Sequence, residues 1–156
     1  MIDVNMVGMK ELKKDFAEMR KRIGEPKVLM DSLGGMGAKN VIQHFDAEEG
    51  PLGSWAPLKH PRKRGGSGIL KDTGRLRAAT RFRTVGRTEA HVFNGVKYAA
   101  AHNFGATIKK GSMSRMGGHG YITYDIPRRK FMWIDERMRG TMRKSMIRWI
   151  LKGLAN

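Results

Sequence analysis

The sequence predicts an α+β fold in which a small antiparallel sheet is flanked by N-terminal helices and a long C-terminal helix. Apolar residues recur at helical spacing in the first 45 residues and again near the C-terminus. Between these helical segments, two short alternating runs are separated by a turn. With 156 residues, 40% of them hydrophobic, the chain (1–156) is expected to form a single domain with flexible loops at about 46–68 and 108–120.

The N-terminal third is predicted to be helical. Met9, Leu12, Phe16 and later apolar residues follow steps of three and four, and Pro26 then ends the helix. A second helix is expected from 27 to about 45. Three glycines inside it, at 34, 35 and 37, each cost about 1 kcal/mol relative to alanine. They therefore either kink the helix or allow another backbone to approach closely.

The middle of the chain is predicted to alternate short helices with strands. Thr73 is expected to cap a short helix through Ala79, and strands follow at 80–85 and 89–93. A further helix should run from Tyr98 to Phe104 and end at Gly105 in a left-handed conformation. A strand at 121–124 completes the set, so that one sheet would be built from 80–94 and 121–125. A C-terminal helix is expected over 134–154, apolar on one face and basic on the other.

Composition excludes several classes of protein. The chain has no cysteine, which excludes disulfides, thiolate metal sites and a cysteine nucleophile, and is typical of a reducing compartment. It has no apolar run of about 18 residues, so no membrane span is expected. The first residues lack the basic and apolar regions of a signal peptide. These features indicate a cytoplasmic protein that does not enter a membrane.

The charge is strongly positive and unevenly distributed. The net charge is +17, with +9 in residues 59–87 and +7 in residues 128–156, whereas residues 31–58 carry −3. Such blocks favour a polyanion or an acidic protein surface as partner, although a solvated surface is equally compatible because no base-reading motif is present. The candidate DNA- or partner-facing cations are Arg62, Lys63, Arg64, Lys109, Lys110, Arg143 and Lys144.

No catalytic, cofactor or metal site is expected. The five histidines lie in different predicted elements, and none forms a metal-binding pair at helical spacing. The glycine-rich segment 65–68 lacks the Lys-Ser/Thr pair and flanking elements of a phosphate loop. The clustered carboxylates of a two-metal nuclease are also absent, which makes an enzyme the least favoured class. His102 is interpreted as a structural hydrogen-bonding group.

Four short motifs carry a more specific signal. In order, they are Phe45 with Glu49-Gly50, Gly53 and Trp55-Ala56-Pro57-Leu58; Ile69-Leu70-Lys71-Asp72-Thr73-Gly74-Arg75-Leu76; Val96-Lys97-Tyr98-Ala99-Ala100-Ala101-His102-Asn103-Phe104-Gly105; and Ile126-Pro127-Arg128-Arg129-Lys130-Phe131. Together they resemble the phage virion morphogenesis family, the tail completion proteins of Mu-like and P2-like phages. One departure is Lys130, which stands where the family usually has proline.

The resemblance implies a structural virion protein, a ring-forming joint between a phage tail and the head connector. Its implied partners are further copies of itself, with six as the expected number, the connector or neck, and tail tube or terminator proteins. DNA would pass through the ring with non-specific contact in the lumen. The implied location is the virion neck, with the host cytoplasm during assembly. The alternative is a nucleic-acid-binding protein associated with DNA packaging or virion assembly.

The motif residues are expected to serve the fold rather than catalysis. Trp55, Tyr98 and Phe104 would be core anchors, and Gly74 and Gly105 would adopt special backbone angles. In a ring, the acidic segment around Glu48 and Glu49 of one subunit would meet a basic block of the next. The motif positions with an expected structural role are Trp55, Pro57, Asp72, Thr73, Gly74, Arg75, Leu76, Tyr98, His102, Phe104, Gly105, Pro127, Arg129 and Phe131.

Overall fold

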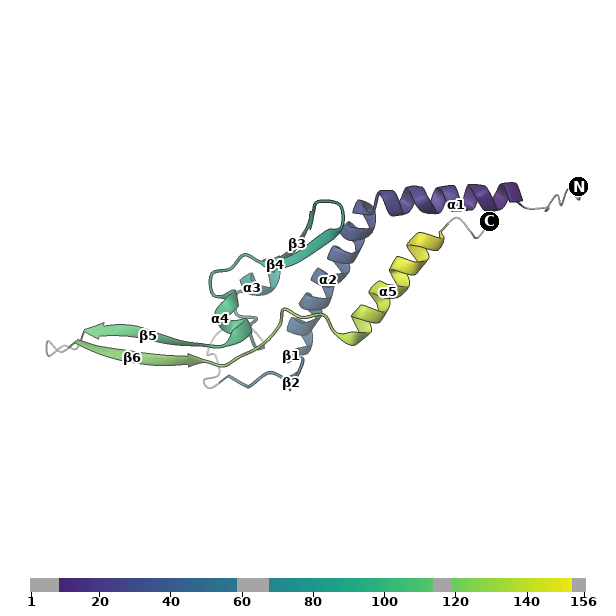
Figure 1. The fold of residues 1–156 in the computed structure, drawn as a ribbon. Helices are drawn as coiled ribbons and strands as arrows, with labels where there is room; N and C mark the ends of the chain where they lie inside the picture. The colour runs from purple at the N-terminus through teal and green to yellow at the C-terminus, as the bar shows by residue number, and fades with distance from the viewer. Residues whose placement is uncertain (1–8, 59–67, 114–118, 153–156) are drawn as a thin grey trace, which may run out of the picture.

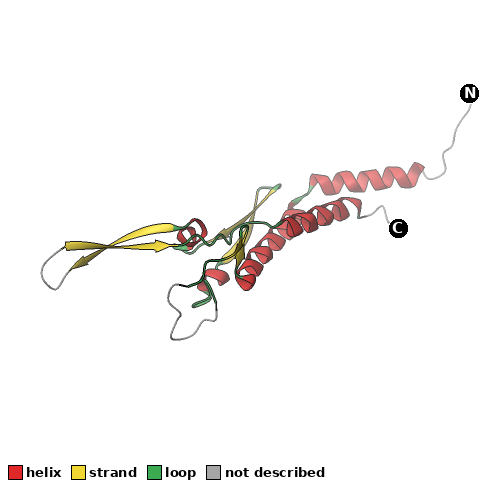
Figure 2. Cartoon of the chain, turned by 90° about the horizontal axis from the view of Figure 1, so that it is seen from below, coloured by secondary structure: helices red, strands yellow, loops and turns green. Residues whose placement is uncertain are grey.

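The computed structural model describes residues 9–58, 68–113 and 119–152, and its outline is elongated (Figure 1). Helices α1 (Met9–Gly24), α2 (Lys27–Ala47) and α5 (Glu136–Leu151) gather at one end. A two-stranded ribbon projects from the other end, which Figure 2 shows from a second direction. The predicted α+β class, with N-terminal helices and a long C-terminal helix, is confirmed.

Helix α2 packs against a hairpin of β3 (Thr80–Val85) and β4 (Glu89–Asn94). The strands pair antiparallel with Phe82 opposite Val92, and both side chains reach the glycine-rich part of α2. A Cβ placed on Gly34 would lie 2.5 Å from Phe82 Cδ2, and one on Gly37 would lie 3.0 Å from Val92 Cγ2. These glycines therefore make room for side chains of the hairpin. Of the two expected alternatives, this is the close approach, but side chains and not another backbone make it.

The core lies at the C-terminal end of α2. Phe45 is fully buried, with its ring centroid 4.8 Å from that of Phe131 and 5.8 Å from that of Trp55. Burying an aromatic side chain contributes about 1.5–3 kcal/mol, so these three rings dominate the cluster. The remaining buried members are Val41, Leu70, Leu76 and Ala99.

The strands do not form the single sheet that was expected. They form three separate two-stranded sheets, and residues 121–125 belong to β6 (His119–Ile126), which pairs with β5 (Ala106–Met113) instead of with β3–β4. Most of the expected loop at 108–120 is therefore strand. The polar composition of this segment suggested a loop. The strands form nevertheless, because each one obtains its hydrogen bonds from the other. The expected loop at 46–68 also contains a small hairpin, β1 (Glu49–Gly50) with β2 (Gly53–Ser54).

Helix ends differ from the predictions in detail. Short helix α3 (Arg75–Ala78) is capped by Gly74 rather than by Thr73. Helix α4 (Ala99–Phe104) ends at Gly105, whose φ of +80° is positive but whose ψ of 156° is extended and not left-handed helical. Helix α5 begins after its N-cap Asp135, and the predicted residues beyond 152 lie outside the described chain. Within the described ranges, no helix is long and apolar enough to cross a bilayer.

Candidate functional site

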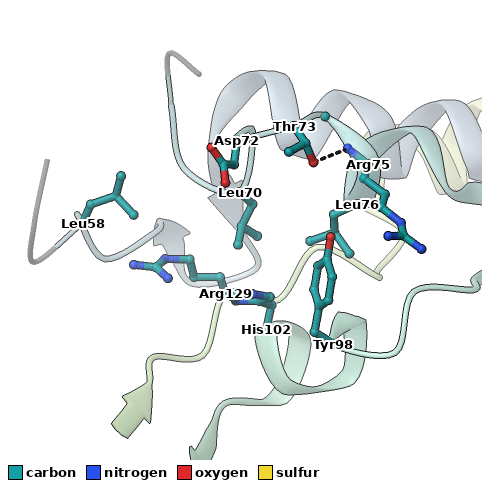
Figure 3. A pocket seen from close by; sticks show the side chains of 10 residues that line it. Leu58, Leu70, Asp72, Thr73, Arg75, Leu76, Tyr98, His102 and Arg129 are labelled. Carbon is teal, nitrogen blue, oxygen red and sulfur yellow. Dashed lines mark hydrogen bonds between the residues drawn. The ribbon is translucent and has the colours of Figure 1, made fainter. Parts of the chain in front are cut away.

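Residues from all four sequence motifs line one pocket beside the core, with a volume of about 600 Å³ (Figure 3). The first motif contributes its last residue and the second most of its length, while the third and fourth contribute three side chains between them. Segments that are far apart in sequence thus converge at one place. The lining residues are Leu58, Leu70, Asp72, Thr73, Gly74, Arg75, Leu76, Tyr98, His102 and Arg129.

The second motif enters the pocket from an anchor on α2. Glu48, the C-cap of α2, has a left-handed backbone, and its Oε1 accepts hydrogen bonds from Ile69 N at 3.0 Å and is 3.2 Å from Lys71 Nζ. Between these two residues, Leu70 adopts a φ of +61°. Positive φ is uncommon for a branched side chain and is retained where the surroundings enforce it. Here the Glu48 carboxylate binds the backbone N–H before Leu70 and the side chain of the residue after it, and Leu70 itself is buried in the core.

A tight turn then directs the second motif along the pocket wall. Gly74, with a φ of +69°, caps α3, and the hydroxyl of Thr73 accepts a hydrogen bond from Arg75 N at 3.4 Å. Leu76 points into the core, and its carbonyl accepts a 2.7 Å hydrogen bond from Asn94 Nδ2. Because a left-handed residue strongly favours glycine, the Thr-Gly-Arg sequence fits this turn. Gly74 and Gly105 both adopt special backbone angles with positive φ, as expected, although Gly105 is not left-handed.

His102 occupies the floor of the pocket between Tyr98 and Arg129 (Figure 3). The Tyr98 and His102 rings meet edge to face with centroids 5.8 Å apart. Burial, and secondly the charge of Arg129, lowers the pKa of His102 below its ordinary 6.5. The imidazole is therefore neutral at pH 7. Its Nδ1 is buried and has no hydrogen-bond partner within the described part of the chain.

Arg129 joins the fourth motif to the first. Its side chain is buried, and its guanidinium donates to Ala56 O from Nε at 3.1 Å and from Nη2 at 2.9 Å, and to Pro57 O at 3.3 Å. Its backbone N–H donates to the carbonyl of His102 at 2.8 Å. One arginine thus joins three motifs. Its planar guanidinium donates hydrogen bonds in a fixed fork, which lysine cannot reproduce.

The motif analysis did not assign a role to Asn103, which is nevertheless one of the most buried polar residues. Its Oδ1 accepts hydrogen bonds from Phe131 N at 3.1 Å and Met132 N at 2.9 Å. The sequence signal for this role was an asparagine within a motif otherwise rich in small and aromatic residues. A buried amide must have hydrogen-bond partners, so such an asparagine is expected to bind neighbouring groups. Asn103 and Arg129 together hold the crossing of the third and fourth motifs.

A second polar cluster, also missed, joins α2 to the start of α5. Asn40 Oδ1 accepts from Asp135 N at 3.2 Å, and Asn40 Nδ2 donates to Asp135 Oδ2. Asp135 caps α5 by accepting a 2.6 Å hydrogen bond from Met138 N, and its Oδ2 lies 3.5 Å from His44 Nε2. Partial burial acts to raise the pKa of Asp135, but these hydrogen bonds outweigh it and lower the pKa. The signal was an aspartate just before a helical stripe.

The predicted core anchors are only partly correct. Trp55 is buried, whereas Tyr98 is 42% exposed and Phe104 is 69% exposed, so the core prediction is wrong for those two. Tyr98 is the N-cap of α4 and Phe104 its last residue, and the buried face of this helix is made by Ala99 and Asn103 instead. A helix of six residues has room for one inward face, and the small residues occupy it.

The basic candidates are not brought together. Arg62, Lys63 and Arg64 lie outside the described residues. Lys109 and Lys110 are exposed on β5, and Arg143 and Lys144 are exposed on α5, at opposite ends of the molecule (Figure 1).

The acidic segment is partly engaged within its own chain. Asp46 pairs with Arg77 at 2.9 Å, and Glu48 pairs with Lys71 at 3.2 Å. Two carboxylates that were expected to face another subunit therefore hold cations of the 59–87 block. Glu49 remains exposed.

The described residues contain no group of three or more histidine or acidic side chains that could hold a metal ion. Neither a curated protein nor a solved structure matches this chain significantly. The sequence profile of the phage virion morphogenesis family matches residues 7–151. The chain therefore belongs to the phage virion morphogenesis family, which points to a structural or assembly role in a phage virion rather than to an enzyme.

Proposed function

We propose that the protein is a tail completion subunit that forms a ring at the joint between a phage tail and the head connector, with DNA passing through the ring. Family membership gives the class of role. The observation that carries the proposal further is that the elongated chain leaves apolar side chains uncovered at both of its ends. A protein built in this way is incomplete alone, and its partners are further copies, the connector and neck, and tail tube or terminator proteins.

The helical end is poorly covered by its own chain. On α1, Phe16 is 60% exposed, and Leu12 and Ile23 are also exposed. On α5, no residue is buried, and Ile147 and Leu151 are exposed. Contiguous exposed apolar surface of this kind marks sites of protein–protein contact. These helices are therefore expected to be covered in the assembled virion.

The exposed charges of α5 support a role beside DNA. The helix carries five exposed basic residues and a single acid, Glu136, which pairs with Arg139 at 2.8 Å. Cations spaced along a helix neutralise phosphates without reading bases, as a ring lumen requires. The basic residues are Arg137, Arg139, Arg143, Lys144 and Arg148. The same residues also favour the second candidate, a nucleic-acid-binding protein of DNA packaging or virion assembly.

The test is native mass spectrometry with negative-stain imaging at low and moderate salt, followed by a salt-titrated DNA-binding assay. A joint subunit should form closed rings through protein contacts, with weak, sequence-independent DNA affinity. A protein that stays monomeric at all concentrations and binds DNA tightly would favour the second candidate and contradict the ring.

A matched pair of variants separates the two activities. Replacing Arg143 and Lys144 by alanine should leave rings intact and reduce the salt dependence of DNA binding by about two phosphate contacts, because each neutralised phosphate contributes a slope near 0.9. The control removes the same charge from Lys13 and Lys14, an adjacent exposed pair on α1. If both pairs weaken DNA binding equally, the α5 face is not the lumen surface.

A further inference from the structure

The most unusual feature of the fold is the two-stranded ribbon made by β5 and β6, which we call the arm (residues 106–113 and 119–126). At about 3.3 Å per residue, each eight-residue strand spans about 26 Å. Figures 1 and 2 both show it projecting away from the helices, without another element laid over either face. An isolated two-stranded hairpin is at best marginally stable in water, so the arm calls for an external partner.

The register gives the arm one apolar face. Ile108 lies opposite Tyr124, and Ile122 lies opposite Lys110, and directly opposed residues share a face. The other face is polar, with Thr107 donating a 2.8 Å hydrogen bond to Asp125 and with Lys109 opposite Thr123. Two residues depart from the pattern, since Lys110 lies on the apolar face and Tyr121 on the polar one.

The apolar face is left open by the chain itself. Ile108, Ile122 and Tyr124 are 46%, 45% and 49% exposed. Alternation of apolar and polar residues along paired strands is typical of a sheet that buries one face and exposes the other to water. Here the pattern of a buried face is present, but the surface that would bury it is missing from the described chain.

A matching surface lies at the opposite end of the same chain. The exposed stripe of Leu12, Phe16 and Ile23 runs along α1 for about 17 Å, which fits within the length of one arm strand. At about 100° per residue, Asp15 borders this stripe, about 60° around the helix from Leu12. One carboxylate is therefore in place beside the stripe for Lys110, the one cation on the arm's apolar face.

We propose that the arm of one copy packs its apolar face along the α1 stripe of the next copy. The inference rests on the proposed ring, and it names the contact that builds it. Two different surfaces at opposite ends of one chain make a head-to-tail contact, which closes into a ring when the rotation between copies allows it. A second copy fits as the occupant because its stripe is apolar, fits within the length of the arm and has the Asp15 carboxylate beside it.

The contact predicts a particular mode of assembly. One arm face measures about 26 Å by about 10 Å, which is small against the roughly 800 Å² per partner of a stable pair. Isolated dimers should therefore be weak. In a closed ring every copy gives one arm and receives another, so assembly should pass from monomer to ring without an abundant intermediate.

Cross-linking tests the contact directly, because the chain has no cysteine of its own. One preparation carries Ile122→Cys and a second, distinguishable by mass, carries Phe16→Cys; they are mixed and oxidised. We expect a disulfide between the two preparations. The matched control, Thr123→Cys, lies on the adjacent position but the opposite face, and should yield at least tenfold less. Leu12→Cys repeats the test without removing the Phe16 ring.

Assembly of charge variants gives the second readout. Ile122→Asp should abolish rings while Thr123→Asp assembles normally, and both should keep the thermal unfolding of the body, because neither side chain contributes to the core. If Ile122→Asp still forms rings like those of the wild type, and no disulfide forms between positions 122 and 16, the arm contact is overturned and the ring proposal stands. Disulfides of Ile122→Cys with itself alone would mean arm-to-arm pairing and would also overturn it. A 122–16 disulfide without rings would support the contact and overturn the ring.

Discussion

The glycines of α2 allow a sharp test of how the β3–β4 hairpin packs. Gly34 and Gly35 are adjacent on the same helix, and replacing either by alanine gains about 1 kcal/mol of helix propensity. The new methyl group at 35 would lie 3.7 Å from Phe82 Cε1, an ordinary contact. At 34 it would lie 2.5 Å from Cδ2 and 3.1 Å from Cγ, so the ring must shift. Overpacking of this kind costs about 1–3 kcal/mol.

The free energy of unfolding should therefore differ by about 2 kcal/mol between the two variants, with Gly35→Ala the more stable. For a domain of this size, that difference corresponds to roughly 4–8 °C in Tm. Thermal unfolding followed by circular dichroism measures it. In a Phe82→Ala background the difference should disappear, because the obstructing ring is gone. If Gly34→Ala melts at or above Gly35→Ala, the packing of Phe82 over Gly34 is wrong.

Three further predictions concern the pocket and the α2–α5 junction. The pKa of His102 is lowered in the fold, so the unfolded chain takes up a proton at a higher pH than the folded chain, and stability should decline as the pH falls from 7. His102→Gln should flatten that decline in urea titrations. An unchanged slope would refute this prediction. Arg129→Lys should lower the free energy of unfolding by about 2 kcal/mol, because lysine loses the forked donation to Ala56 O, and a variant as stable as wild type would contradict this. Asp135→Ala should cost about 1 kcal/mol at pH 7 through loss of the cap. Because the pKa of Asp135 is lowered in the fold, the stability it provides is present above about pH 3.8 and is lost on further acidification, so the variant and wild type should converge there.

Local patterns were enough to predict the long elements. The spacing of three and four predicted α1, and the alternation at 80–93 predicted the β3–β4 hairpin with its turn. Both succeed because the hydrogen bonds of a helix or a tight hairpin join residues close in sequence, so the residues that decide the structure lie within the pattern itself. The positive φ at Gly74 and Gly105 was predictable for the same reason.

Only part of the pocket could be predicted from the sequence. The motifs indicated which segments mattered, but not that Leu58, Leu70, His102 and Arg129 meet around one cavity. Asn103 escaped notice because its role is to satisfy backbone donors 28 and 29 residues away. Whether a polar side chain is a surface residue or an internal bracket depends on its distant partners, which a local pattern does not contain.

The sequence by itself determined the α+β class, the family, the positions of the long helices and the first hairpin, since each depends on local hydrogen bonding or on a short motif. Only the tertiary structure decided that residues 106–126 form a separate arm, that Tyr98 and Phe104 face outward, and that four motifs share a pocket. The physical reason is that strand pairing and burial are properties of pairs of segments. Their energies depend on which segment lies opposite, and that choice is made by the whole chain.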